Sequence, residues 1–233
     1  MDDFAQQLPA PLRPTRLLSR IILVAVGLYV LCNALHIVIL SLLRSSVRSG
    51  QPLSPLMTEL DTLQTKLPLL GAPLYLFAGI CFLVLVSRLV ANLPTLGSQT
   101  MLTPSAAVWS FLIPIVNLVG GYRTTRTIWT ESQPVTRNFA TPQAVPLLGL
   151  WWASYLALGL TSRLIQVGTK LPDGFTIEQW SNASYWLSVD ALVNLVAGGL
   201  FMCVVFLLDR RQSEQHDDLT RRVPVAMRSD LLR

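Results

Sequence analysis

Five polar side chains stand inside or beside long apolar stretches, where they could bind a proton or a cation: Asn33, His36, Arg163, Asp190 and Asn194. Ionisable groups inside membrane-spanning segments are energetically costly, so each is by default a candidate functional residue. Asn33 and His36 are three residues apart, whereas Asp190 and Asn194 are four apart. Each pair therefore shares one face of a helix.

The depth of these residues predicts that the two pairs meet. With a rise of about 1.5 Å per residue, two antiparallel helices over 21–43 and 186–208 place Asn33 level with Asn194, and His36 close to Asp190. This placement permits a His–Asp site for a proton or cation, with Arg163 as a further partner of Asp190. The alternative, which we prefer, is structural: such side chains link membrane helices by hydrogen bonds of about 0.6–2 kcal/mol. Asp190 could also simply interact with the helix dipole in the first turn of its helix.

Catalytic and metal-binding motifs are missing from the sequence. It contains no HExxH, GxGxxG, Walker A or GxSxG string. The three cysteines, Cys32, Cys81 and Cys203, lie in separate apolar runs, which gives neither a disulfide framework nor a zinc site. We therefore expect a protein that is not an enzyme and that uses no metal or cofactor.

Composition identifies the class of protein that must position these side chains. Hydrophobic residues make up 52% of the 233 residues and charged residues only 13%, whereas a soluble domain carries about 25% charged residues. A helix needs about 20 apolar residues to cross a bilayer. Four segments meet this requirement and are predicted to cross: 21–43, 69–88, 145–164 and 186–208. They leave a cytoplasmic N-tail, 1–20, and a disordered cytoplasmic C-tail, 209–233.

A fifth apolar stretch, 104–122, is predicted not to cross, because of the distribution of basic residues. If it stays on one side, the N-tail, the segment 88–144 and the C-tail share 13 of the 18 Lys and Arg residues. Such an excess is typical of the cytoplasmic side. If the stretch crosses, the C-tail moves outside and the asymmetry disappears. We therefore predict an all-α, integral membrane four-helix bundle with both termini cytoplasmic, in a bacterial inner membrane.

The stretch that does not cross is predicted to form a short re-entrant or interfacial helical hairpin over 104–132. Pro104 suits the first position of a helix, Pro114 interrupts it, and Gly120-Gly121 could reverse the chain. We expect the hairpin to pack against the four helices and not to face lipid, since irregular backbone at membrane depth must be covered. Asn117 is expected to cap the backbone carbonyl of Ser110 that Pro114 frees, facing Arg88 or Asn92.

The same region resembles a known family. The residues that carry the resemblance are Arg88, Asn92, Pro104, Trp109, Pro114, Asn117, Tyr122, Arg123 and Trp129. Their combination resembles the signature of DUF4328, a set of mostly bacterial multi-helix membrane proteins with no established biochemical role. The chain departs from that pattern at Gly120-Gly121, where relatives tend to have a proline, and at Thr127, where they tend to have an acidic residue. The resemblance supports a membrane domain over 21–208 and implies no mechanism.

Two functions fit this sequence. The preferred one is a structural or regulatory membrane module that binds lipid, another membrane protein or a second copy of itself. The alternative is a component of a small-solute or ion transporter or channel that uses the intramembrane His-Asp-Asn cluster. We expect no nucleic-acid partner, because the net charge of +5 follows from the topology.

Overall fold

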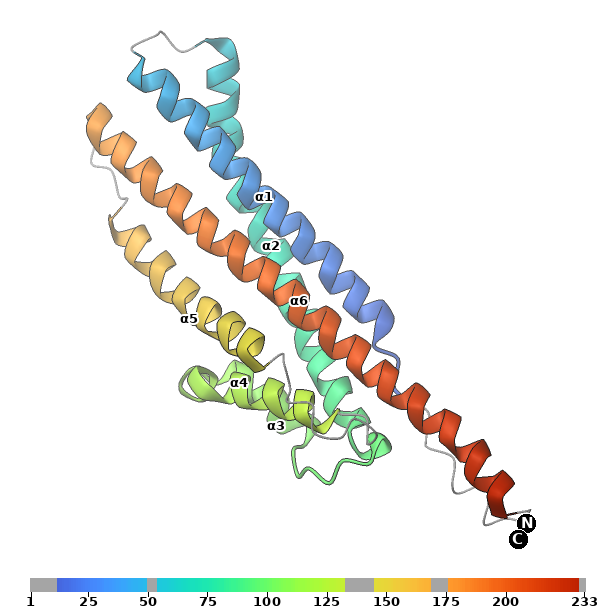
Figure 1. Ribbon diagram of the computed structural model, residues 1–233. Helices are drawn as coiled ribbons and strands as arrows, with labels where there is room; N and C mark the ends of the chain where they lie inside the picture. Colours follow the sequence, from blue (N-terminus) through green and yellow to red (C-terminus); the bar gives the residue numbers. More distant parts are fainter. Residues whose placement is uncertain (1–11, 50–53, 133–144, 169–175, 231–233) are drawn as a thin grey trace. The chain divides into compact units, whose positions relative to one another are not determined.

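The computed structural model describes residues 12–49, 54–132, 145–168 and 176–230, and this part of the chain contains helices and no strands (Figure 1). The elements in chain order are α1 (Arg16–Arg48), α2 (Pro55–Asn92), the 3-10 helix η2 (Pro94–Leu96), α3 (Pro104–Leu112), α4 (Pro114–Glu131), α5 (Val145–Gly168) and α6 (Ile177–Asp230). The predicted all-α class is confirmed.

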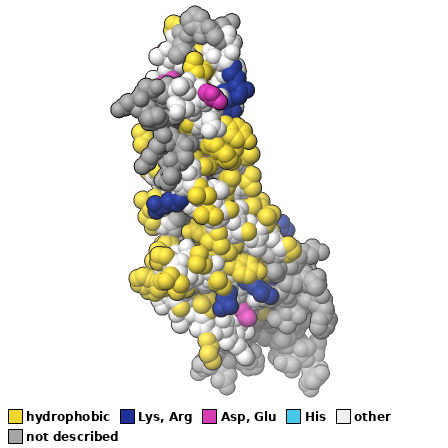
Figure 2. Space-filling model, turned by 90° about the vertical axis from the view of Figure 1, so that its left-hand side faces the viewer, with side chains coloured by type: hydrophobic (Ala, Val, Ile, Leu, Met, Phe, Trp, Pro, Cys, Tyr) yellow, Lys and Arg dark blue, Asp and Glu magenta, His cyan; other side chains and the backbone are white. Residues whose placement is uncertain are grey.

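Three of the described helices are long and apolar enough to cross a membrane: α1, α2 and the part of α6 from Ile177 to Thr220. Hydrophobic side chains also cover much of the surface drawn in Figure 2, as expected for a surface that meets lipid. Helix α5 is not among the three. The coarse prediction of a membrane protein is supported, whereas a fourth crossing by α5 stays a prediction.

The predicted disordered C-tail, 209–233, is wrong for residues 209–230, because α6 continues to Asp230. The sequence from Phe201 to Arg222 contains neither glycine nor proline, so nothing ends the helix at its apolar boundary. Two glutamines in this extension, Gln212 and Gln215, are almost fully buried. The extension is therefore held by specific contacts.

The chain divides into two compact units, and α1, α2, α5 and α6 each contribute to both. Unit 1 comprises Met1–Ile22, Ile80–Gly149 and Cys203–Arg233, whereas unit 2 comprises Leu23–Gly79 and Leu150–Met202.

In unit 2, small and aromatic residues bring segments of four helices together. A Cβ atom at Gly198 of α6 would lie 2.6 Å from Cγ2 of Val30, so glycine permits the close approach of α6 to α1. The rings of Tyr29 on α1 and Tyr75 on α2 lie 5.4 Å apart. On the other side of α6, the ring of Phe201 stacks on Trp151 of α5 at 5.9 Å.

In unit 1, α3 and α4 form the expected helical hairpin. Thr103 caps α3 by accepting a hydrogen bond from the Ala106 amide, and Pro104 and Pro114 each begin a helix. The chain reverses at Ile113, whose backbone is extended, and α4 continues through Gly120-Gly121. The prediction that these glycines form the turn is therefore wrong.

Gly120 instead permits close contact between the two helices of the hairpin. A Cβ atom at Gly120 would lie 3.3 Å from the carbonyl oxygen of Ser110. One turn further along α4, the hydroxyls of Ser110 and Thr124 lie 2.9 Å apart.

Adjacent glycines of α6 provide a matched test of the contact in unit 2. Gly198→Ala places a methyl group against Val30 and should destabilise the protein by about 1–3 kcal/mol. Gly199→Ala meets no atom within 4 Å and should stabilise it by about 0.5–1 kcal/mol, because alanine loses less backbone entropy. Thermal unfolding in detergent measures both. Equal melting temperatures for the two variants would contradict the close approach.

Candidate functional site

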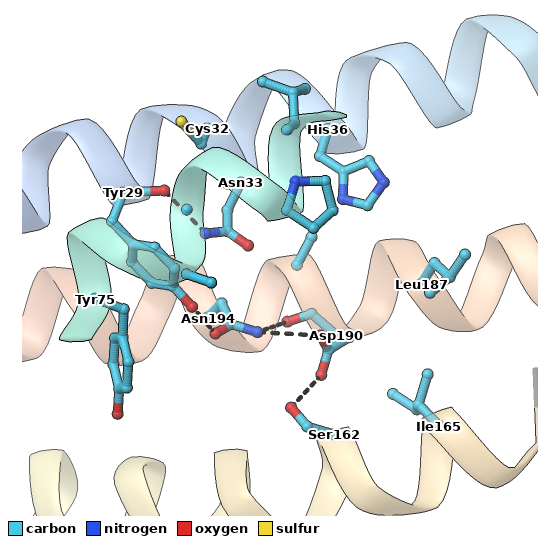
Figure 3. Close-up of a pocket in the computed structure, with 15 residues that line it drawn as sticks. Tyr29, Cys32, Asn33, His36, Tyr75, Ser162, Ile165, Leu187, Asp190 and Asn194 are labelled. Carbon is cyan, nitrogen blue, oxygen red and sulfur yellow. Dashed lines mark hydrogen bonds between the residues drawn. The ribbon is translucent and has the colours of Figure 1, made fainter. Parts of the chain in front are cut away.

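The polar side chains of unit 2 line a cavity of about 330 Å³, which we call the polar cavity (Figure 3). Its polar lining comes from all four helices: Tyr29, Asn33 and His36 of α1, Tyr75 of α2, Ser162 of α5, and Asp190 and Asn194 of α6. Four of the five residues singled out in the sequence thus lie together. The depth argument placed these four in one region although they come from opposite ends of the chain.

A chain of hydrogen bonds fixes the polar side of this cavity. The Tyr29 hydroxyl donates to Asn194 Oδ1, and Asn194 Nδ2 donates to the Asp190 carbonyl at 2.8 Å and to Asp190 Oδ2 at 3.2 Å. Ser162 Oγ donates to the other carboxylate oxygen, Oδ1, at 2.8 Å. Both oxygens of Asp190 therefore accept hydrogen bonds, and Asn194 is oriented by contacts at both ends of its amide.

Asn33 and His36 take different positions at the cavity. Asn33 Nδ2 donates to the Tyr29 carbonyl of its own helix at 2.9 Å, an interaction that holds its side chain along α1. The imidazole of His36 lines the cavity.

Arg163 does not join the cluster. Its side chain is exposed and is not part of the cavity lining. The neighbouring Ser162 contacts the carboxylate instead, because the two residues point about 100° apart around the helix. The expected Arg163–Asp190 pair is therefore wrong.

A second polar cluster lies in unit 1, where the hairpin ends, and we call it the hairpin junction: Asn92, Trp129, Ser132, Arg211 and Gln212. Gln212 Nε2 donates to the Leu89 carbonyl of α2 at 2.9 Å and to Ser132 Oγ at 3.1 Å. Asn92 Nδ2 donates to Gln212 Oε1 at 3.3 Å. One side-chain amide thus joins α2, α6 and the end of α4.

Arg211 strengthens the same connection. Its Nε donates to the Ser132 carbonyl at 3.2 Å, and its guanidinium carbon lies 4.0 Å from the centre of the Trp129 ring. Trp129 is only 6% exposed. A cation over an indole face contributes about 0.5–2 kcal/mol.

Arg88 and Asn92 bind the segment before α1. The Asn92 side chain accepts from the Arg13 amide at 2.9 Å and donates to the Arg13 carbonyl at 3.2 Å, while Arg88 Nη1 donates to the Pro14 carbonyl at 2.7 Å. We expected one of them to face Asn117, but these hydrogen bonds run to the N-terminal segment. The capping role of Asn117, whose backbone amide donates to the Ile113 carbonyl at 2.7 Å, stays a prediction.

The apolar side chains at the turn of the hairpin are exposed. We call them the hairpin tip: Trp109, Leu112, Ile113, Ile115, Val116, Leu118 and Val119. Ile115 is 83% exposed and Trp109 57%. The tip side chains are therefore not covered by the described part of the chain, and the expectation that the hairpin avoids lipid stays a prediction. Because α3 and α4 satisfy most of their own backbone groups as helices, lipid can contact this surface.

Two further motif residues follow the tip along α4. Tyr122 is half-buried, whereas Arg123 is exposed. This order, from apolar to cationic, suits a helix that leaves the hydrocarbon for the headgroup layer.

Sequence reasoning missed Tyr29, Ser162 and Gln212. The spacing of Leu208, Gln212 and Gln215 by four and then three residues continues one face of α6 past its apolar part, and that signal could have identified the buried glutamines. Tyr29 lies one turn before Asn33, so it could have been placed on the same face.

Comparisons with known proteins yield one family. The family model described as "Domain of unknown function (DUF4328)" matches residues 56–210. No curated protein and no solved structure match the chain. The matched range includes α3, α4 and all polar lining residues of the cavity from α2, α5 and α6.

Removal of the Gln212 amide should loosen the hairpin junction. Gln212→Leu keeps a similar volume but leaves buried polar partners unsatisfied, at about 1–3 kcal/mol each, so the melting temperature in detergent should fall. The control is Glu214→Leu, two residues away, which removes only the exposed Arg210–Glu214 ion pair and should cost less than about 1 kcal/mol. If both variants melt alike, Gln212 does not hold the junction.

Proposed function

The chain belongs to the DUF4328 family, and we propose that it is a multi-pass module of the bacterial inner membrane that acts by binding lipid through its hairpin. The role is structural or regulatory, and no chemical reaction is part of it. The observation that best supports this proposal is the exposed apolar surface of the hairpin tip. The other end of the hairpin is joined to α2 and α6 by the hydrogen bonds of Gln212.

The proposed topology has four crossings, by α1, α2, α5 and α6, with both termini in the cytoplasm. Its support is the placement of 13 of the 18 basic residues on one side and the apolar length of α1, α2 and α6. Helix α5 completes an even number of crossings. The hairpin then enters the bilayer from the cytoplasmic side and returns to it.

The composition of the hairpin supports this insertion. Its tip is apolar, whereas Arg123 and Arg126, further along α4, are exposed cations. Basic side chains at that position favour anionic headgroups of the cytoplasmic leaflet. Because the hairpin junction connects the hairpin to α2 and α6, a movement of the hairpin caused by lipid at the tip would also displace these two helices. A membrane protein or a second copy of the chain could also cover the tip, and would then replace lipid there.

A second candidate function is transport of a small solute or ion. The one observation that supports it is the polar cavity. A flux measurement with the purified protein in liposomes tests it. Flux that requires Asp190 would rank transport above the lipid-binding module.

Insertion of the tip is tested with a fluorescent label at two positions of the hairpin. The label is placed at Ile115→Cys or at Arg126→Cys, in a chain whose three native cysteines are replaced by alanine. In liposomes, nitroxide groups deep on the acyl chains should quench the label at residue 115 about twofold or more over that at 126. Aqueous iodide should show the opposite order. Strong iodide quenching at residue 115 would refute insertion.

A further inference from the structure

The polar cavity contains a carboxylate, Asp190, that forms no ion pair with Lys or Arg among the described residues. Asp190 accepts hydrogen bonds only from neutral donors, Ser162 and Asn194, and no Lys or Arg among the described residues pairs with it. Arg44 of α1 donates instead to the hydroxyls of Ser184 and Ser188, at 3.2 and 3.1 Å. Figure 3 shows the carboxylate between α5 and α6, with the Asn194 amide beside it.

A charge in this position needs compensation. Asp190 lies within a helix that can cross the membrane, where an uncompensated carboxylate is costly. His36 also lines the cavity, but no ion pair within 4 Å joins its imidazole to Asp190. The arrangement therefore favours a cation that enters the cavity.

The rest of the lining indicates what kind of cation fits. Asp190 is the only acidic residue in the lining, and the described residues contain no cluster of His, Cys, Asp and Glu that could hold a metal. A divalent ion prefers six or more oxygen ligands. The remaining surface is largely apolar, with contributions from Leu67, Ile165 and Leu187.

Aromatic rings add a second feature that suits a cation. Tyr29 and Tyr75 both line the cavity, and their ring centroids lie 5.4 Å apart. Ring faces attract ammonium groups, and alkylated ammonium ions are commonly bound in this way. A volume of about 330 Å³ is at the small end of the range for ligand pockets.

We propose that the polar cavity binds a small organic ammonium ion, whose charged nitrogen lies against Asp190 and whose hydrocarbon groups contact Tyr75 and the apolar lining. Asn194 and Ser162 orient the carboxylate for this contact. The inference concerns binding alone, so it depends neither on lipid binding by the hairpin nor on transport.

The test uses choline as the probe and the full-length protein in a maltoside detergent, which itself carries no ammonium group. Calorimetric titration should show saturable binding of choline. Its neutral isostere, 3,3-dimethylbutan-1-ol, should bind about tenfold more weakly or not detectably, because it lacks the charge. Sodium and potassium chloride at the same ionic strength should not compete.

Variants assign the binding to the cavity. Asp190→Asn should weaken choline binding about tenfold or more, whereas Asp217→Asn, which removes the same charge from an exposed position of α6, should leave it unchanged. Tyr75→Leu, at a half-exposed position, should weaken binding about three- to tenfold. This variant also keeps the test valid if Asp190→Asn fails to fold.

Three results would overturn the proposal. Equal binding of choline and its neutral isostere would indicate an apolar pocket without charge recognition. Competition by sodium or potassium would indicate an inorganic ion. Unchanged choline affinity in both Asp190→Asn and Tyr75→Leu would place the binding outside the cavity. Quenching at residue 115 would be unaffected in each case, so failure here is distinct from failure of the lipid-binding proposal.

Discussion

The hydrogen bonds of the Gln212 amide connect three parts of unit 1 that are far apart in the sequence. They reach the Leu89 carbonyl on α2, the hydroxyl of Ser132 after α4, and Asn92 at the end of α2. Asn92 extends the connection to the backbone of Arg13. The hairpin between Asn92 and Ser132 can therefore present an apolar tip while both of its ends stay fixed.

The proposed insertion into lipid accounts for how this hairpin is built. Backbone groups in lipid need internal partners, so two helices with a minimal turn at Ile113 are a stable solution. Pro114 begins α4 at a position where the missing N–H costs nothing. Gly120 lets α4 pass close to the Ser110 carbonyl. The cavity in unit 2 differs from the apolar hairpin tip, because its polar side chains form hydrogen bonds with one another around the Asp190 carboxylate.

Much of this architecture could be predicted, because membrane helices follow from apolar length. Pro104 predicted the start of α3, whereas Pro114, expected to interrupt a helix, instead begins α4. The rise per residue placed Asn33, His36, Asp190 and Asn194 in one region. Charge composition misled us at the C-terminus: a sequence that is polar and nearly neutral reads as disordered, yet buried amides hold it as a helix. The sequence also could not predict that Ser162, and not Arg163, contacts the Asp190 carboxylate, because this depends on the rotation of α5 about its axis.

The central claim, that the hairpin returns to the side where α6 leaves the membrane, is tested by the accessibility of two positions in the full-length chain. Single cysteines replace Arg137, after the hairpin, or Glu214, beside Gln212, in a chain without native cysteines. An impermeant maleimide should label both in inverted inner-membrane vesicles and neither in spheroplasts. Labelling of the two positions from opposite sides would show that the stretch from α3 to α4 crosses the membrane, and would contradict the account.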